Sequence, residues 1–195
     1  MMMSKNELRY YMECDKIALR IPGNIKRPRL FRDRIWKYER VLRKLEYYTN
    51  VRSSRLLRIF YMLVHKRMSE RLTIFIPPNV FGPGLSIAHS ACIVVNSNAS
   101  VGCNCRIHEG VTIGATNGSD KAAVIGDNVF LGSGCKVIGN VKIADDVAIG
   151  AGAVVVNDVV ESSVSVGGVP AKVISHNGSK TNIVVATKEY MLLKQ

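Results

Sequence analysis

Two histidines in the second half of this 195-residue chain have the residue type and the spacing to share one site. His108 directly follows an aliphatic residue of a regular six-residue series, and His89 lies where that series is interrupted, between Ile87 and Val95. An imidazole can act as a general base because free histidine titrates near neutral pH. We therefore predict that His89 is a base, and that His108 and its neighbour Glu109 contact a substrate. A structural histidine, bonded to a corner of the fold, is the alternative for both.

Neither the other histidines nor the cysteines predict a metal site. His65 lies in a basic segment and His176 in a polar tail, where we expect ordinary surface residues. Only two histidines lie on one wall of the expected fold and no third is placed to join them, so we predict no metal. The five cysteines show no CxxC spacing, and we infer neither a zinc site nor a disulfide framework from them.

A repeat of six residues determines where these histidines lie. A period of six fits neither the 3.6 of a helix nor the 2 of an ordinary strand, and it is typical of a parallel β-helix with three units to a coil. The aliphatic residues of the series should point into the interior, and we expect Phe75, Phe81 and Ile87 to extend it toward the N-terminus. Ser119 occupies one position of the series, and ten others are aliphatic: Val95, Val101, Ile107, Ile113, Ile125, Leu131, Val137, Ile143, Ile149 and Val155.

The interruptions of the repeat predict a register and a loop. Two extra residues follow Ile87, so it should align with Ile107 on the next coil. Because neighbouring strands lie about 4.8 Å apart, we expect His89 and His108 on adjacent coils of one wall. The polar residues 116–120 should form a loop. Loops and register breaks on a rigid scaffold often carry the chemistry of a protein.

The N-terminal third of the chain is basic and should be helical. Residues 26–71 hold fifteen Lys and Arg against four acidic residues, which is nearly the whole net charge of +12. Apolar residues recur at helical spacing over 31–48 and 54–70, and these helices should cover the open end of the β-helix. In the tail we expect a strand at 183–185 and a short helix at 188–194. The expected parts are a helical, basic segment of residues 1–72, a β-helix of residues 73–175 and a tail of residues 176–195.

The excess of basic residues has two interpretations. We favour a solvated helix face, and the alternative is attraction to an anion, either a membrane surface or a lipid-linked, phosphate-bearing substrate. We expect no nucleic acid partner, because the chain has no recognition motif and no interleaved aromatic residues. No apolar run is long enough to cross a bilayer, and the N-terminus lacks the apolar region of a signal peptide. We therefore expect a cytoplasmic protein, with contact at the inner face of the membrane as an open alternative.

Several segments of the chain resemble a known family. These segments keep the order that they have in the family: IPPNVFGPGLSIAH at 76–89, IVV at 93–95, VTIGAT at 111–116, IGDN at 125–128, IGAGAVV at 149–155 and GGVPAK at 167–172. Together they resemble the serine acetyltransferase branch of the hexapeptide acyltransferases, over about residues 74–175. The N-terminal stretches YMECDK at 11–16 and KRPRLF at 26–31 look like the related proteins of capsular or O-antigen polysaccharide synthesis.

The resemblance implies a fold, an assembly and a set of site residues. The fold is an all-β left-handed parallel β-helix with an α-helical N-terminal segment, assembled as a homotrimer with acetyl-CoA in grooves between subunits. His89 matches the catalytic base of the family. The residues that match cofactor-binding positions are Gly114, Ala115 and Thr116 beside the acetyl group, Ser133 and Ala151 along the pantetheine arm, and Lys172 near the CoA end.

The chain departs from the family where the acceptor binds. Ile74 stands where the family has the aspartate that orients the catalytic histidine, and Ala88 replaces an acidic residue that helps to hold serine. Ala122 replaces a substrate-binding histidine, and Lys121 alone keeps the basic character of a neighbouring arginine. An amino acid acceptor carries two charges that are usually met by charged partners, whereas a sugar hydroxyl needs none.

These departures determine the expected function. We predict an acetyl-CoA-dependent O-acetyltransferase, with no metal, that acts on a sugar hydroxyl in polysaccharide biosynthesis, with a small-molecule or lipid-linked sugar as acceptor. One alternative is an L-serine O-acetyltransferase of cysteine biosynthesis. The other is a non-catalytic β-helix scaffold, since the orienting acid is absent and a fold alone does not imply an activity.

Overall fold

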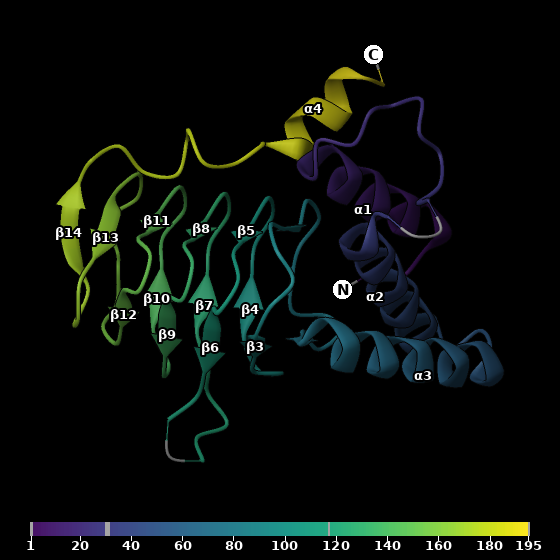
Figure 1. Cartoon of the computed structure of the whole chain (residues 1–195), viewed down its shortest axis with the longest axis horizontal. Coiled ribbons are helices and arrows are strands. Elements are labelled where there is room, and N and C mark those ends of the chain that lie inside the picture. The colour runs from purple at the N-terminus through teal and green to yellow at the C-terminus, as the bar shows by residue number, and fades with distance from the viewer. Residues whose placement is uncertain (1, 30–31, 117, 195) are drawn as a thin grey trace.

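The computed structural model describes residues 2–29, 32–116 and 118–194, and it joins a bundle of helices to a prism of short strands (Figure 1). Three helices precede the strands: α1 (Lys5–Ala18), α2 (Arg34–Val51) and α3 (Arg55–Leu72). The chain then winds away from them, and its last helix, α4 (Ala186–Leu192), returns to lie beside α1. None of the described helices combines the length and the apolar character needed to span a bilayer.

The prism has three walls, each a stack of very short strands. The first wall holds β1 (Ile74–Phe75), β3 (Ile93–Val95), β6 (Thr112–Gly114), β9 (Lys136–Ile138) and β12 (Val154–Val155). The second holds β4 (Ser100–Val101), β7 (Val124–Ile125) and β10 (Lys142–Ile143). The third holds β2 (Ser86–Ile87), β5 (Arg106–Ile107), β8 (Phe130–Leu131), β11 (Ala148–Ile149), β13 (Ser165–Gly167) and the antiparallel β14 (Lys172–Ser175).

The interior of the prism confirms the six-residue repeat and the parallel β-helix. All ten aliphatic residues of the series are buried, with at most 5% of their surface exposed. An inward residue of one coil stacks on the equivalent inward residue of the next coil, as the pairing of Ile107 with Leu131 and of Leu131 with Ile149 shows. The small inward residues Cys105 and Cys135 are buried in the same core. Each coil therefore buries its own apolar face against its neighbours, which is the main stabilising force of such a stack.

The first coil departs from the prediction. Phe75 is 47% exposed, and the adjacent Ile76 points inward with 1% exposed. The frame shifts because Phe81, which bridges to Val101 on the next coil, follows Ile76 by five positions and not by six. The prediction for Phe75 is therefore wrong, while Phe81 is buried as expected.

The helices confirm two predictions and correct a third. The helices expected at 31–48 and 54–70 are α2 and α3, although Phe31 lies outside the described residues. The strand expected at 183–185 is wrong. Val184 instead packs with α1 and α4 around Cys14 and Ala186, so it contacts helices rather than a sheet. Ile183 is buried, and Val185 is exposed.

A buried cation fastens the helices to the first coil. Arg43 of α2 is fully buried and donates from Nε and Nη2 to Asp15 of α1, at 2.8 and 3.1 Å. Its guanidinium also donates to Glu46 at 3.0 Å and to the carbonyls of Phe81 and Gly82 at 2.8 and 2.6 Å. Burial opposes the charge, but Asp15 and Glu46 outweigh it and raise the pKa of Arg43. The helical segment therefore covers the end of the prism through a satisfied polar network.

Candidate active site

The two histidines of interest meet at one corner of the prism. Ile87 pairs with Ile107 in parallel register, which confirms the two inserted residues. The rings of His89 and His108 stand edge to face, with centroids 5.8 Å apart and planes at 80°. His89 is exposed, and His108 is partly covered by the ring of Phe130, 5.1 Å away. The loop that contains the register break therefore projects His89 beyond the last strand residue, over the outer face of the wall.

The register places a column of residues below His89 at the same corner. Glu109, Ser133 and Ala151 each lie two residues after an aligned inward residue, so they follow His89 from coil to coil. The hydroxyl of Ser133 is 3.3 Å from Nδ1 of His108. Oε2 of Glu109 lies 3.8 Å from the same nitrogen. Side chains of two adjacent coils thus surround one ring, and Glu109 is the acid nearest to the two histidines.

The surroundings of His108 and Glu109 lower the pKa values of both groups. Burial lowers the pKa of His108, and the charges of Arg106 and His89 lower it further against an opposing effect of Glu109. The bond with Ser133 lowers the pKa of Glu109, as does its own backbone amide. His108 is therefore neutral at pH 7 while Glu109 is a carboxylate. Oε2 of Glu109 is shielded from solvent and has no hydrogen-bond partner among the described residues.

The residues that match the acetyl site lie at a different corner of the same chain. Gly114 ends β6, and Ala115 and Thr116 begin the loop that protrudes below the prism in Figure 1. Lys121 follows in this loop and is exposed. The three-residue strand β6 separates this loop from the corner of Glu109 by about 10 Å, at about 3.3 Å per residue. A single chain therefore does not bring this loop and His89 together.

Lys172 lies at the far end of the corner column. It is exposed on β14, where it pairs with Gly167 of β13. Four coil-to-coil steps separate His89 from Gly168, which is about 19 Å at about 4.8 Å per step. Ala151 is exposed along the way. The corner thus offers an extended track from the histidines to a basic residue.

The positions that depart from the family offer no charged group to this corner. Ile74 is fully buried and belongs to the core, so its side chain does not face solvent beside His89. Ala122 is also buried, with 3% exposed, and Ala88 is partly buried. Counting residues along the repeat already predicts Glu109 one coil below His89 on the same wall, where either Glu109 or a backbone carbonyl could fix the imidazole. The register that aligns Ile87 with Ile107 also puts residue 109 under residue 89.

Three side chains at this corner could hold a metal ion. His89, His108 and Glu109 each offer one ligand atom, and these atoms all lie within 4.8 Å of one another. The prediction of no metal rested on the absence of a third histidine and did not count Glu109 as a ligand. The other two histidines lie elsewhere. His65 is partly buried beside Tyr38, whose hydroxyl is 3.1 Å from its Nε2, so it is not the ordinary surface residue that was expected. His176 is exposed as expected.

Comparison with known proteins relates this geometry to one class of enzyme. Residues 122–157 match the family model of the bacterial transferase hexapeptide (six repeats). The serine acetyltransferase of Synechococcus elongatus is 39% identical over 103 residues, which is 52% of this chain and 42% of that enzyme. The chain spans less than half of the length of the curated relatives that it matches.

Solved structures extend the likeness over most of the chain. The serine acetyltransferase of Brucella abortus in complex with coenzyme A is 27% identical with a TM-score of 0.68, over 89% of this chain and 68% of that one. The soybean serine acetyltransferase complexed with serine is 28% identical with a TM-score of 0.71, over 87% and 70%. These named proteins are all serine acetyltransferases, so they give no support to the capsular or O-antigen branch. The comparisons confirm the fold: hexapeptide repeats that form a left-handed β-helix behind an N-terminal helical region.

Proposed function

We propose that this protein is an acetyl-CoA-dependent O-acetyltransferase whose general base is His89. The observation that carries the proposal is the corner where His89, His108 and Glu109 converge, on a hexapeptide β-helix that is similar to enzymes of this activity. The column from His89 past Ser133 and Ala151 supports a binding track for the long pantetheine arm. Lys172, at its far end, would face the phosphates of CoA.

The proposed reaction is a direct transfer between two bound substrates. His89 accepts the proton of an acceptor hydroxyl while the hydroxyl oxygen attacks the thioester carbonyl. The C–O bond forms, the carbonyl oxygen becomes an oxyanion, and backbone N–H groups near Gly114 and Ala115 stabilise it. The tetrahedral intermediate then collapses, the C–S bond breaks, and CoA leaves as a thiolate that takes up the proton. No covalent bond to the protein is needed.

Glu109 would orient His89 in place of the aspartate that Ile74 replaces. A base works best when a second group fixes its ring and stabilises its protonated form. Ile74 is buried in the core and cannot do so, whereas the ionised Glu109 lies at the same corner with one shielded, unpartnered oxygen. The neutral ring of His108 packs edge to face with His89 and further restricts it. We therefore assign positioning roles to Glu109 and His108.

The complete site in this proposal belongs to two chains of a homotrimer. His89 and the loop with Gly114, Ala115 and Thr116 lie at different corners of one prism, so a thioester cannot contact both within one chain. A neighbouring prism, related by a threefold axis, would bring its own loop to the corner of His89. Lys121 of that loop would then reach the acceptor.

L-serine is the acceptor that we propose first. The comparisons favour it over the sugar predicted from the departures, because the similar proteins named above are serine acetyltransferases and one of them holds serine. Glu109 offers a carboxylate for the ammonium group, and Lys121 offers a cation for the carboxylate. A sugar hydroxyl is the competing acceptor, since Ala88 and the buried Ala122 offer no charged partner.

The test is the release of free thiol from acetyl-CoA with each acceptor in turn. We expect release that depends on L-serine and is saturable in both substrates. Release with sugars or sugar nucleotides, and none with L-serine, would replace the acceptor but keep the transferase. No release with any acceptor, together with no saturable binding of acetyl-CoA, would favour the scaffold.

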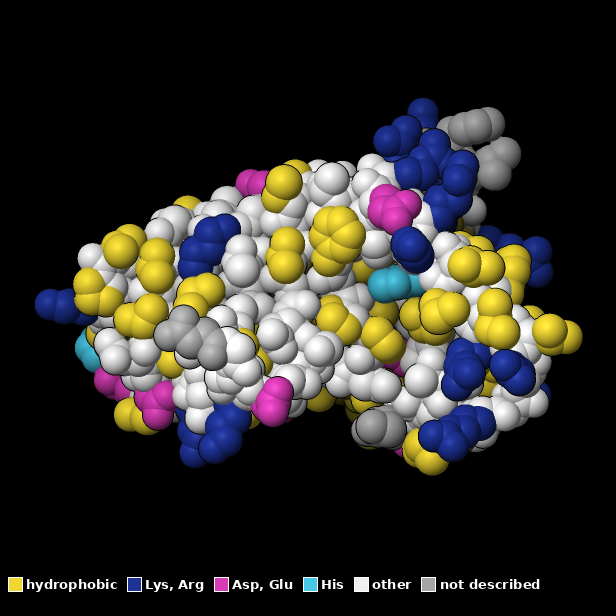
Figure 2. All heavy atoms as spheres, turned by 90° about the horizontal axis from the view of Figure 1, so that it is seen from below, with side chains coloured by type: hydrophobic (Ala, Val, Ile, Leu, Met, Phe, Trp, Pro, Cys, Tyr) yellow, Lys and Arg dark blue, Asp and Glu magenta, His cyan; other side chains and the backbone are white. Residues whose placement is uncertain are grey.

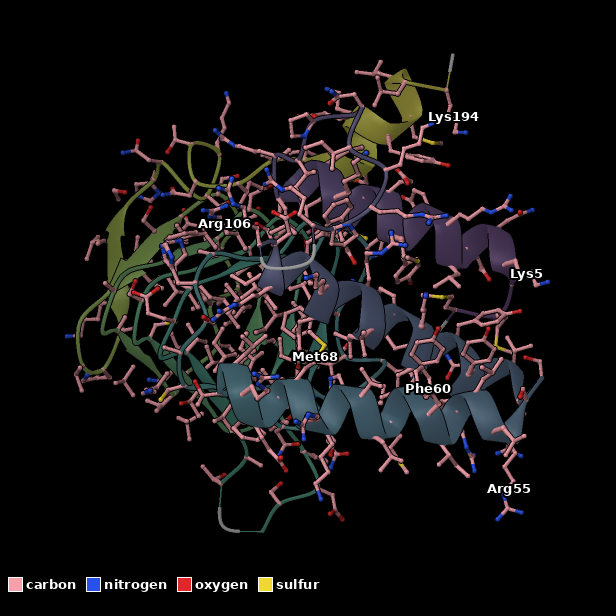
Figure 3. The ribbon with its side chains drawn as sticks, turned by 45° about the vertical axis from the view of Figure 1, so that its right-hand side comes forward. Lys5, Arg55, Phe60, Met68, Arg106 and Lys194 are labelled. Carbon is pink, nitrogen blue, oxygen red and sulfur yellow. The ribbon has the colours of Figure 1, made fainter. Side chains whose placement is uncertain are left out.

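The helical segment supports a second proposal, contact with an anionic membrane. The helix α3 runs along the outer edge of the bundle and exposes large apolar side chains: Leu56, Leu57, Ile59, Phe60, Met62 and Leu63 (Figure 3). Lys and Arg side chains lie beside this apolar surface (Figure 2). A helix with these two features fits an interface of acyl chains and negative headgroups.

Sedimentation with lipid vesicles tests this contact. The protein should bind vesicles that contain phosphatidylglycerol and not vesicles of phosphatidylcholine alone, and the double variant Phe60→Ser, Leu63→Ser should lose this binding.

A further inference from the structure

The side chains at the corner of His89 could bind a cation as well as act in proton transfer. Their three potential ligand atoms, from His89, His108 and Glu109, all lie within 4.8 Å of one another. Within that cluster, Oε2 of Glu109 is shielded from water and lacks a hydrogen-bond partner among the described residues, although 37% of the Glu109 side chain is exposed. A shielded acceptor without a partner is costly, and a cation would satisfy it.

We propose that this corner binds a borderline divalent cation of the zinc type, and that the cation blocks acetyl transfer. The first part of the inference stands on the geometry alone, and the second rests on the proposed role of His89 as base. Two imidazole nitrogens and one carboxylate oxygen form a ligand set that Zn²⁺ accepts, with its remaining position open to water. Magnesium and calcium prefer oxygen ligands and should bind far more weakly.

The distances allow such a site with small movements. Zinc bonds to nitrogen and oxygen are about 2.0–2.2 Å long, so two ligand atoms on one ion lie at most about 4 Å apart. Nδ1 of His108 and Oε2 of Glu109, at 3.8 Å, already meet this limit. His89 is exposed on its loop and can close the remaining gap of about 1 Å by a side-chain rotation. Ser133, 3.3 Å from Nδ1 of His108, would give up that contact.

Inhibition follows from the atoms that the cation would use. A metal-bound imidazole nitrogen has donated the lone pair that a general base needs to accept a proton. The cation would also neutralise Glu109, which we assign to positioning His89. Binding of the cation and transfer of the acetyl group should therefore exclude each other.

The chain contains a matched control for the site. His176 and Glu161 also form a histidine–carboxylate pair, with 3.1 Å between Nδ1 and Oε1, but both side chains are well exposed. No third ligand joins this pair within the described part of the chain. The exposed thiol of Cys92 is a second possible source of zinc binding and needs its own control.

Calorimetric titration of the metal-free full-length protein with ZnCl₂ tests the site without any substrate. We expect one ion per chain, and a loss of affinity of at least about tenfold in His108→Gln and in Glu109→Gln. His176→Ala and Cys92→Ser should bind like the wild type. Unchanged affinity in His108→Gln and Glu109→Gln, or loss of binding in Cys92→Ser, would overturn the assignment.

Thermal unfolding of each variant shows whether a loss of binding comes from misfolding. A Co²⁺ titration followed by absorbance then reports the ligand set directly.

Activity measurements separate this inference from the proposed function. Thiol release in the presence of EDTA shows whether the protein is a transferase at all. If it is, added Zn²⁺ should inhibit it at the concentration that fills the site, and EDTA should reverse the inhibition. Full activity with the site filled would refute the blocking role, while zinc binding by a protein without transferase activity would leave the cation site intact and remove only the proposed function.

Discussion

An exposed imidazole becomes a useful base only when its surroundings orient it and a substrate reaches it. The ring of His108 and the carboxylate of Glu109 lie on one side of His89, and its exposed side faces solvent. That open side is where an acceptor hydroxyl and a thioester would have to lie. The residue therefore contributes nothing to the core, and its replacement should affect chemistry rather than folding.

The replacement of His89 by alanine is the most direct test at this scale. We expect turnover to fall at least about a hundredfold, because a general base contributes roughly 10²–10⁴ to the rate. The dissociation constant of acetyl-CoA should stay within about twofold of the wild type. Turnover is measured by thiol release and binding by calorimetry.

The control for this variant is His176→Ala, which removes an exposed histidine far from the corner in sequence. It should leave both quantities unchanged. Near-normal turnover in His89→Ala would remove His89 from the role of base, and weakened acetyl-CoA binding would give it a binding role instead.

The pairing of the two histidines could be predicted from the sequence, but their full environment could not. The register that aligns Ile87 with Ile107 follows from counting residues, because parallel coils repeat with a fixed period. Side-chain directions at a corner do not follow from that count. The count therefore places Glu109 one coil below His89, but the distances among the three side chains and the burial of Ile74 appear only in three dimensions.

At the scale of elements, the repeat and the helices differ in how much the sequence reveals. The walls were predictable since each inward position carries its own signal every six residues. The helix α1 was not predicted, and its buried residues include the charged Asp15 and Lys16, which an apolar pattern does not reveal. Contacts with other elements stabilise it instead: Asp15 pairs with Arg43 of α2, and Cys14 and Ala18 pack with Ala186 of α4.

The junction between helices and prism should depend strongly on Arg43. Its replacement by methionine leaves Asp15 and Glu46 buried as charges without their partner, along with the carbonyls of Phe81 and Gly82. Breaking a buried ion pair from one side typically costs about 3–5 kcal/mol. We expect a loss of this size in the free energy of unfolding by urea.

Arg67→Met is the matched control, because Arg67 is exposed on α3. Its replacement should change the free energy of unfolding by less than about 0.5 kcal/mol. An equally small effect in Arg43→Met would mean that the buried network gives no net stability.

A third buried acid at this junction should make stability depend on pH. Glu39 of α2 is fully buried and accepts a bond from the backbone N–H of Ile87 at 3.0 Å, while its Oε2 has no partner among the described residues. Burial raises the pKa of Glu39 well above its ordinary value, and the charge of Asp15 adds to this. The folded state therefore binds this proton more tightly than the unfolded state does.

Glu39→Gln should remove this pH dependence. For an acid with a raised pKa, the stabilising contribution is complete below the unfolded-state pKa of about 4.3 and is lost as the pH rises through the folded-state value. The variant should therefore unfold at a higher temperature than the wild type at pH 8, and the difference should shrink toward pH 5. A variant that is less stable than the wild type at pH 8 would show that ionised Glu39 contributes favourably through Ile87.

At the scale of the whole molecule, the proposed site is divided between the corners of the prism. His89 and Glu109 lie at one corner, and the loop that begins with Ala115 lies at another. This separation follows from the triangular coil itself, since one wall always lies between two corners. No movement of side chains can close that distance within one chain. In the proposed function, a second chain completes the site.

Two inactive variants should therefore restore activity when they share a trimer. His89→Ala removes the base, and Ala115→Arg places a large cation where the acetyl group would lie. In any mixed trimer around a threefold axis, only one of the three interfaces combines an intact His89 with an intact loop, so about one third of wild-type turnover per chain should return.

Co-expression with two different tags and purification over both isolates the mixed trimers. Mixed trimers of His89→Ala with His89→Gln contain no intact base and should stay inactive. If the trimers of His89→Ala with Ala115→Arg are equally inactive, each chain must contain its own complete site, and the proposed position of acetyl-CoA between subunits is wrong.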